Sequence, residues 1–335
     1  MKPSENLVII DADSLIYIVG ADLANMQLEP LGIMKLDEFI TSILESTKSQ
    51  NYLGFLGGGG ENFRNAIGVT KEYKGNRKAD KPEWFDFWQP VLVDHMVTHW
   101  GFHKCGNIEA DDACHIARNA YIDKYKKVTI ASPDKDLFQI GETFFYDYNK
   151  RYHAFCSESV SIQKHCVQLI TGDSTDNIPG CTGAGAKAAA EVADIISKEG
   201  LNRNHALYEA YKFYHKWYGV ILRDKEVAKQ EKAYLDQYKI DNGIKVLKKA
   251  VRSNALAKFV PDLSGIMSTD KVTALFKEQY ALITLLGTVE QGLSHGFTLP
   301  EPSVNSTVDW DSVILYDNEL DQAPEEQLFD FEEDL

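Results

Sequence analysis

Two short, largely apolar runs, each followed closely by an aspartate, constrain the fold of this chain more than any other feature. Residues 7–10 (Leu-Val-Ile-Ile) lead directly into Asp11, and residues 127–131 lead through a Ser-Pro pair into Asp134. Short continuous apolar runs are typical of strands buried on both faces of a parallel sheet. Because parallel strands end at one common edge, we expect Asp11 and Asp134 to lie side by side in a protein of the α/β class.

Further elements follow the same pattern. Residues 52–56 predict a third strand, and Ala110–Tyr125 has the apolar spacing of a helix. Three acids, Glu109, Asp111 and Asp112, fall in its first turn, where the helix dipole favours negative charge. An acidic helix cap alone explains one or two of these residues but not three. From Ser161 to about Gly296 the pattern becomes largely helical.

Eight carboxylates occur in four short blocks, and carboxylate oxygens are the ligands that hard divalent ions prefer. Two such ions a few Å apart can hold the attacking and leaving oxygens of a phosphodiester, so the blocks predict metal-assisted phosphodiester hydrolysis. Asp13 is close enough to be a ligand, but we expect it to point away from Asp11 along the strand, as an outer partner at most. The eight residues are Asp11, Glu109, Asp111, Asp112, Asp134, Asp136, Asp173 and Asp176.

Two segments suit nucleic-acid binding. Residues 70–81 mix Lys and Arg with Tyr73, and such a mixture suits a single-stranded end because cations hold phosphates while rings stack on bases. The same segment is equally compatible with a charged loop before the aromatic helix that begins near Trp84. Further along, a glycine-rich turn opens a helix whose first backbone N–H groups can hold a phosphate. Its residues are Gly180, Gly183, Gly185 and Lys187.

A net charge of −15 is unfavourable for a DNA-binding protein. The charge is, however, unevenly distributed along the chain. Residues 301–335 hold 12 Asp and Glu and no Lys or Arg, so residues 1–300 carry a net charge of −3. Residues 203–258 hold 13 Lys and Arg against 6 Asp and Glu, which suits contact with phosphates. A solvated helix face is the simpler interpretation of any single lysine there. Beyond Pro300 we expect a largely disordered acidic tail.

Other conspicuous residues predict no further chemistry. The five cysteines are an odd number without CxxC spacing, so we expect reduced, buried side chains and neither a zinc site nor disulfides. The helical spacing of His95, His99 and His103 suggests a metal, but these residues flank aromatic ones and are interpreted as a partly buried helix face. No apolar run approaches about 18 residues and no signal peptide is evident, so we expect a cytoplasmic protein without a membrane partner.

Five motifs occur in an order that resembles bacteriophage 5′→3′ exonucleases and flap endonucleases, and that is similar to the 5′-nuclease domain of bacterial DNA polymerase I. The resemblance covers roughly residues 5–190. The motifs are Ile10-Asp11-Ala12-Asp13, Glu72-Tyr73-Lys74-Gly75-Asn76-Arg77, Glu109-Ala110-Asp111-Asp112, Asp134-Lys135-Asp136 and residues 172–180 (Gly-Asp-Ser-Thr-Asp-Asn-Ile-Pro-Gly).

The resemblance implies three parts of the chain. Residues 1–160 would form a PIN-like α/β nuclease domain with a central, mostly parallel sheet and a helical arch over the active site. Residues 161–300 would form a mostly helical DNA-binding domain with a helix-three-turn-helix, followed by a flexible acidic tail at 301–335. The tail resembles those of replication proteins that dock on a sliding clamp or on single-strand binding protein. A solubilising tail with no partner is an equal alternative.

The resemblance also implies an activity. We expect a metal-dependent 5′→3′ exonuclease or flap endonuclease that hydrolyses phosphodiesters at or near 5′ ends of duplex DNA in replication or repair. Flapped or nicked DNA and RNA primers would be substrates, and products would carry 5′-phosphates. The implied cofactors are two Mg²⁺ ions, with Mn²⁺ as a substitute, and K⁺ at the helix-three-turn-helix.

Roles carry over to residues that match the motifs. The first metal site would be formed by Asp11, Glu109 and Asp111. The second site and its surroundings would be formed by Asp112, Asp134, Asp136, Asp173 and Asp176. Contact with the phosphate and stabilisation of transition-state charge would fall to Lys74 and Arg77, and base stacking to Tyr73. The backbone of the uncut strand would be held by Gly180, Gly183, Gly185 and Lys187.

One departure from the family pattern affects the first metal site. The family has an aspartate after its second strand, ahead of the pair that is Phe63-Arg64 here, and this position falls within Gly57–Gly60. Glu61 could substitute, or water could replace the missing ligand, which Mg²⁺ tolerates. The alternative is a DNA-binding scaffold of the same fold with weakened catalysis. We favour the enzyme, because decay normally erodes several ligands and the eight carboxylates are present.

Overall fold

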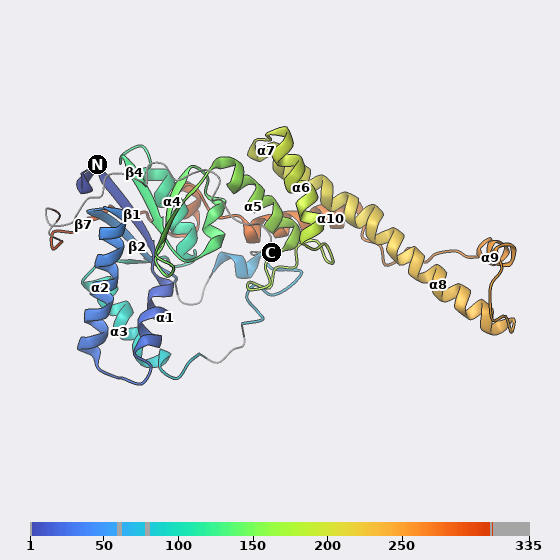
Figure 1. Cartoon of the computed structure of the whole chain (residues 1–335), viewed down its shortest axis with the longest axis horizontal. Coiled ribbons are helices and arrows are strands. Elements are labelled where there is room, and N and C mark those ends of the chain that lie inside the picture. The colour runs from blue at the N-terminus through green and yellow to red at the C-terminus, as the bar shows by residue number, and fades with distance from the viewer. Residues whose placement is uncertain (1, 59–61, 78–80, 309, 311–335) are drawn as a thin grey trace.

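Among the residues that the structure describes, seven strands form one sheet that organises the N-terminal half (Figure 1). This computed structural model describes residues 2–58, 62–77, 81–308 and 310. The strand order is β3-β2-β1-β4-β5-β6, with β7 beside β2, and the pairs from β3 to β5 are parallel. The strands are β1 (Asn6–Asp11), β2 (Asn51–Leu56), β3 (His103–Lys104), β4 (Lys127–Ala131), β5 (Thr143–Asp147), β6 (Tyr152–Cys156) and β7 (Ser303–Val304).

Strand β1 divides its side chains between two hydrophobic cores. Val8 and Ile10 pack with α1 (Asp13–Asp22), α2 (Glu29–Thr47) and α3 (Phe85–Thr98) on one face of the sheet. Leu7 and Ile9 pack with α4 (Ala110–Tyr121) on the other face. All four side chains are fully buried, and each contributes about 1.5–3 kcal/mol by leaving water. The predicted central strands, their parallel arrangement and the α/β class are therefore confirmed.

The middle of the chain is helical, as predicted. Helices α5 (Glu158–Thr171), α6 (Ala186–Glu199), α7 (Arg203–Lys216) and α10 (Thr269–Ile283) surround a third core. Residues 172–185 join α5 to α6 through a series of turns. After α10 the chain returns to the sheet: Leu285 and Phe297 join the core beneath α4, and α11 (Val289–Ser294) packs against that helix.

A long helical arm projects from the helical part (Figure 1). Helix α7 continues through a π-helical turn, η4 (Trp217–Leu222), into α8 (Arg223–Asp241), and α9 (Lys249–Leu256) lies near the tip. Leu235 is the one buried side chain of α8. We call residues 223–258 the basic arm. Its α8 segment alone is about 28 Å long, because a helix rises about 1.5 Å per residue.

Two expectations are corrected. Between η2 (Phe63–Ala66) and α3, the described residues 67–77 and 81–84 form turns and bends, so the helical arch is absent from them. The start of the expected disordered tail is ordered: β7 pairs with β2, and the Asn305 N–H donates to the Gln50 carbonyl oxygen at 2.9 Å. The tail from residue 311 onward, with its expected partner-binding role, lies outside the described residues, as do residues 59–61.

The expectations about the cysteines and about membrane-spanning segments can be checked directly. All five cysteines are buried and free of disulfides, as predicted. Within the described ranges, no helix combines the length and the apolar character needed to cross a membrane.

Candidate active site

The carboxyl ends of β1 and β4 bring the first two predicted ligands together. Ile10 pairs with Ala131 in the parallel register, so both strands end at the same level. The Ser132 hydroxyl donates to Asp11 Oδ2 at 2.8 Å and accepts the Asp134 N–H at 3.0 Å. One serine thus links the two aspartates, and the structure confirms that they lie side by side.

Two further segments contribute carboxylates to this edge. Glu109 and Asp111 occupy the N-cap and first turn of α4. Asp173 lies in the α5–α6 turn, where its Oδ1 accepts the N–H groups of Thr175 at 2.7 Å and Asp176 at 3.2 Å. The Gln168 amide donates to Asp136 Oδ1 at 3.0 Å and to Asp173 Oδ2 at 3.3 Å, which ties the turn to the segment that follows β4.

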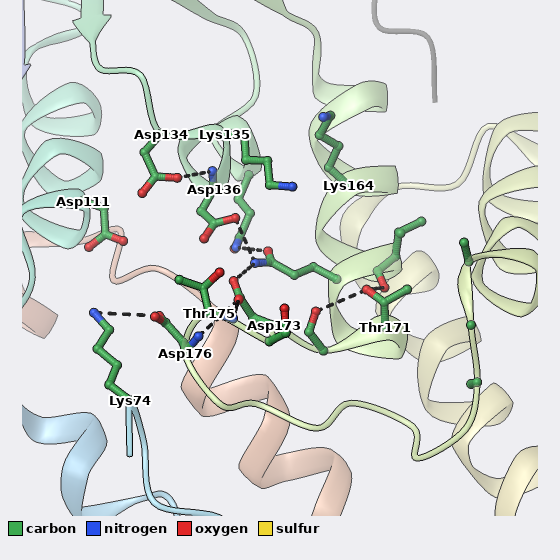
Figure 2. Close-up of a pocket in the computed structure, with 18 of the residues that line it drawn as sticks. Lys74, Asp111, Asp134, Lys135, Asp136, Lys164, Thr171, Asp173, Thr175 and Asp176 are labelled. Atoms are coloured by element: carbon green, nitrogen blue, oxygen red, sulfur yellow. Dashed lines mark hydrogen bonds and ion pairs between the residues drawn. The ribbon is translucent and has the colours of Figure 1, made fainter. Parts of the chain in front are cut away.

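One cavity of about 520 Å³ is lined by Asp111, Asp134, Asp136, Asp173 and Asp176, whereas Asp11 and Glu109 are not among its lining residues. Figure 2 shows the carboxylates of Asp111, Asp134 and Asp176 pointing into the same space from different segments. The cavity extends to the first residues of α6, so a helix N-terminus opens onto the carboxylate cluster. The lining includes Lys74, Arg77, Asp111, Asp134, Asp136, Asp173, Asp176, Gly185 and Ala186.

Burial and electrostatic crowding raise the pKa of several acids in this cluster. Burial, reinforced by the charges of Asp13 and Asp134, raises the pKa of Asp11 to about 7. Burial and neighbouring aspartates likewise raise the pKa of Asp136 to about 7. Burial, with the charges of Glu109 and Asp112, raises the pKa of Asp111 well above its ordinary value. A bound dication would offset this repulsion. The donors are all oxygen atoms, which fits Mg²⁺ or Mn²⁺ better than softer metals.

Lys74 and Arg77 reach the cluster from a loop that is fixed to the α5–α6 turn. The Lys74 N–H donates to the Asp176 carbonyl oxygen at 2.9 Å, and the Asn177 amide donates to the Glu72 carbonyl oxygen at 2.8 Å. The Lys74 ammonium contacts Glu109 and lies 3.8 Å from Asp176 Oδ2. The Arg77 guanidinium is 2.5 Å from Asp176 Oδ1. Both predicted cations therefore stand beside the carboxylates.

Tyr73 does not fit its predicted role as a base-stacking platform. Its side chain is only 6% exposed, because the ring packs against Ile178 and Leu282. Its hydroxyl lies 2.7 Å from Glu109 Oε2 and 2.9 Å from Asp176 Oδ2. Tyr73 instead holds two carboxylates in place. The ring is unavailable to a nucleobase unless this packing is broken.

The predicted phosphate-binding glycines differ from one another. Gly180 is buried, adopts a φ of +58°, and donates its N–H to Gln279 Oε1 at 2.9 Å. A Cβ there would lie 2.3 Å from the Gly172 nitrogen, so Gly180 closes the turn and has no N–H left for DNA. Gly183 and Gly185 are exposed, with open space where a side chain would be, and Lys187 is exposed in the first turn of α6.

Arg64 is a residue whose importance the sequence reasoning missed. Its side chain is 1% exposed, and it donates to Asp112 Oδ2 at 2.6 Å and Oδ1 at 2.8 Å. Its Nε also donates to the Leu282 carbonyl oxygen at 2.9 Å. Asp112 is thus committed to a buried ion pair and does not line the cavity, unlike the other predicted second-site ligands. Removing one partner of such a pair typically costs about 3–5 kcal/mol.

The expected direction of the Asp13 side chain is also corrected. Strand β1 ends at Asp11 and α1 begins at Asp13, so the argument from strand geometry does not apply. Residues two apart on a strand would in any case share a face. The Asp13 carboxylate accepts the Gly57 N–H at 2.9 Å, which places it between the ends of β1 and β2.

Residues 6–165 match the family model described as 5′-3′ exonuclease, N-terminal resolvase-like domain. The match covers 160 of the 335 residues, just under half of the chain. The chain is also similar to DNA polymerase I of Bacillus subtilis (strain 168), 27% identical over 213 residues, and of Lactococcus lactis subsp. cremoris (strain MG1363), 24% identical over 267 residues. These matches cover 56% and 71% of this chain but only 23% and 28% of the relatives. The chain thus spans about a quarter of their length.

Solved structures show the same fold. The T5 D15 protein co-crystallised with metal ions has a TM-score of 0.56 at 17% identity, covering 87% of this chain and 92% of its own. The T5 5′-exonuclease with bound zinc has a TM-score of 0.50 at 18% identity, covering 83% of this chain and all of its own. These likenesses confirm the fold class that the motifs implied.

The raised pKa of Asp11 predicts that the metal-free protein loses stability as the pH rises. In the folded state this pKa is about 7, against an ordinary value of 3.8, so the folded chain binds more protons between these values. The free energy of unfolding therefore falls across this window. We expect Asp11→Asn, measured by urea unfolding in EDTA, to gain on the order of 4 kcal/mol relative to wild type between about pH 4 and about pH 8, because one pKa unit corresponds to about 1.4 kcal/mol. Asp22→Asn is the control, and a pH-independent difference for Asp11→Asn would contradict the prediction.

Proposed function

We propose that this chain is a divalent-metal-dependent 5′-nuclease that hydrolyses phosphodiesters at or near 5′ ends of duplex DNA, including flaps, nicks and RNA primers. The observation that supports it best is the convergence of carboxylates from three segments, the start of α4, the end of β4 and the α5–α6 turn, on one cavity beside Lys74 and Arg77. Its location at the carboxyl ends of parallel strands is the usual place for ligand binding in such sheets.

The residues present fit two metal ions. Asp11, Glu109 and Asp111 would hold the first, and the second would be held by Asp134, Asp136, Asp173 and Asp176, with Asp112 behind them as an anchor. Mg²⁺ or Mn²⁺ bound there would supply Lewis-acid activation of water and stabilisation of the leaving oxygen. The products would carry 5′-phosphates. K⁺ at the helix-three-turn-helix stays a prediction from the resemblance.

The cations beside the cluster give the site its preference for phosphates. Lys74 and Arg77 are held by Glu109 and Asp176 at the rim of the cavity, where they would contact the oxygens of the scissile phosphate. Because they are already ordered, they would stabilise developing charge without reorganisation. The open start of α6, with Gly183, Gly185 and Lys187, would hold a backbone phosphate of the uncut strand.

Cleavage of a 5′-flap and a nicked duplex tests this proposal. We expect cutting near the 5′ end with Mg²⁺ or Mn²⁺, none with EDTA, and products that a ligase can join because they carry 5′-phosphates. Asp134→Ala and Lys74→Ala should each lower kcat by at least about 100-fold, since each removes a group that acts on the transition state. Asp123→Ala, an exposed acid outside the site, is the matched control.

The opposite outcome has a definite meaning. If wild-type protein binds both substrates and cuts neither with either metal, the DNA-binding scaffold with weakened catalysis replaces the enzyme.

The basic arm is proposed to contact duplex DNA beyond the active site. Residues 242–261, at its tip, hold five Lys and Arg and no Asp or Glu. Lys245, Lys248 and Lys249 are exposed and form no ion pair with any described residue. The length of α8 alone corresponds to about eight base pairs of duplex.

Binding measured at several duplex lengths and salt concentrations tests whether the basic arm contacts DNA. Lys248→Ala/Lys249→Ala should weaken binding of a long duplex substrate and lower the slope of log affinity against log salt by about 0.9 for each lost phosphate contact. A substrate too short to reach the tip should be bound and cut as by wild type. Lys124→Ala/Lys126→Ala is the matched control at the sheet. Equal losses on short and long duplexes would contradict this role.

A further inference from the structure

The end of β2 shows how the chain accommodates its missing aspartate. Gly57 follows β2 directly, and a Cβ built there would lie 2.7 Å from Asp13 Oδ2. The Asp13 carboxylate therefore stands where a side chain from position 57 would begin. Gly58 is no alternative, because its Cβ would lie 1.8 Å from the Gly106 carbonyl oxygen. Among the described positions of this glycine run, the space for a carboxylate is filled from Asp13.

The surroundings of Asp13 are those of a metal ligand. Its carboxylate is held at 2.9 Å by the Gly57 N–H, at the same sheet edge as Asp11. It interacts electrostatically with Lys74, Glu109 and Asp11, which include two of the ligands expected at the first metal site. A negative charge in this position has no structural partner among the described residues that would neutralise it at close range. A cation shared with Asp11 and Glu109 would neutralise the charge of the Asp13 carboxylate.

We propose that Asp13 is a ligand of the first divalent metal and supplies, from the start of α1, the carboxylate that the family pattern places after the second strand. The inference rests on the proposed nuclease function. It explains two departures together: glycine at position 57 leaves room for the Asp13 carboxylate, and Asp13 supplies the charge that glycine lacks.

Metal binding by a set of paired variants tests whether Asp13 supplies the carboxylate that is missing at position 57. Mn²⁺ binding is measured by titration calorimetry for wild type, Asp13→Ser, Gly57→Asp and the double variant Asp13→Ser/Gly57→Asp. We expect Asp13→Ser to weaken one of two Mn²⁺ sites at least about tenfold, since it removes one oxygen ligand. Gly57→Asp alone should also weaken it, because two carboxylates compete for one space. The double variant should restore affinity to within about threefold of wild type.

The controls separate ligand loss from misfolding. Asp22→Ser, at the other end of α1, should bind Mn²⁺ like wild type. The isosteric Asp13→Asn should repeat the loss without lowering the thermal unfolding temperature in EDTA, since it removes a buried charge that helps raise the pKa of Asp11. Unchanged Mn²⁺ binding by Asp13→Ser, or no restoration in the double variant, would overturn the inference while wild type still cuts DNA. Wild type that neither binds Mn²⁺ nor cuts DNA would overturn the proposed function as well.

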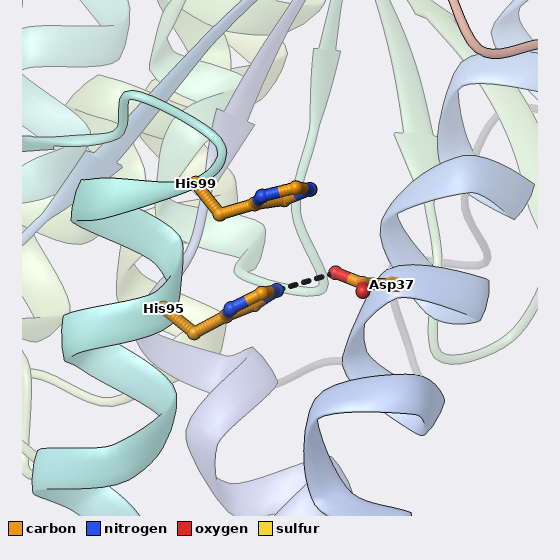
Figure 3. A group of neighbouring side chains, drawn as sticks. All are labelled: Asp37, His95 and His99. Atoms are coloured by element: carbon orange, nitrogen blue, oxygen red, sulfur yellow. Dashed lines mark hydrogen bonds and ion pairs between the residues drawn. The ribbon is translucent and has the colours of Figure 1, made fainter. Parts of the chain in front are cut away.

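A second, independent observation is a histidine–aspartate cluster between α2 and α3 (Figure 3). The ligand atoms of Asp37, His95 and His99 all lie within 4.8 Å of one another. The two imidazole rings are stacked 4.7 Å apart at an interplanar angle of 12°, and both point toward Asp37. His95 Nε2 lies 2.7 Å from Asp37 Oδ1. None of the three lines the active-site cavity.

The cluster has the composition and support of a transition-metal site. The Trp100 indole N–H donates to Asp37 Oδ1 at 2.7 Å and so orients the carboxylate, as outer partners do around metal ligands. The His99 imidazole has no hydrogen bond to any described residue, and it is exposed to solvent. His103, grouped with these histidines by spacing, lies on β3 and outside the cluster.

We infer that Asp37, His95 and His99 bind a first-row transition ion of the Zn²⁺ class, which would join α2 to α3. Two imidazoles and one carboxylate form a common donor set for Zn²⁺, with a fourth position left to water. Mg²⁺ prefers oxygen ligands, so the catalytic carboxylates and this cluster would select different ions.

Co²⁺ as a spectroscopic probe tests this site. In a large excess of Mg²⁺, which occupies the catalytic carboxylates, Co²⁺ should give the strong visible absorption of tetrahedral nitrogen ligation, and Zn²⁺ should displace it. His99→Ala should weaken Co²⁺ binding at least about tenfold and abolish the rise in thermal unfolding temperature caused by Zn²⁺. His205→Ala, an exposed histidine on α7, is the control. No such absorption in wild type, or equal binding by His99→Ala, would overturn the inference.

Discussion

Arg64 donates two short hydrogen bonds to Asp112 where neither side chain is exposed to water, and this ion pair connects three parts of the chain. Arg64 follows β2, Asp112 lies in the first turn of α4, and Arg64 also donates to the carbonyl oxygens of Leu282 and Thr284 at the end of α10. Buried charges are tolerated only when they are paired and hydrogen-bonded, so these segments hold one relative position. The first turn of α4, with Glu109 and Asp111, is thereby fixed against the sheet edge.

The same anchoring explains how so many carboxylates are kept together. Backbone N–H groups, Ser132, Gln168 and the Tyr73 hydroxyl hold individual acids, and Lys74 and Arg77 offset part of their charge. Burial, together with the negative charge that remains uncompensated, raises the pKa of Asp11 and of Asp136. An arrangement that is unfavourable in the metal-free chain is favourable for a dication, which links the instability of the site to its proposed chemistry.

Much of the site was predictable because strand ends and helix starts are local features. The apolar runs before Asp11 and Asp134 indicated buried parallel strands, and the acids at 109–112 indicated a helix N-terminus. The role of Tyr73 was not predictable in this way, since its burial depends on Ile178 and Leu282, about 100 and 200 residues away. Gly180 likewise donates its N–H to Gln279, a partner that no local motif indicates.

The sequence by itself determined the α/β class, the order of the central elements and which acids gather at one edge, because periodicity and capping act over a few residues. Only the tertiary structure decided how each acid is used: Asp112 is paired with Arg64, whereas Asp13 fills the space beside Gly57. It also brought Asp37 to His95 and His99 from another helix. The physical reason is that hydrogen bonds, ion pairs and steric fit depend on atoms that meet only after distant segments pack.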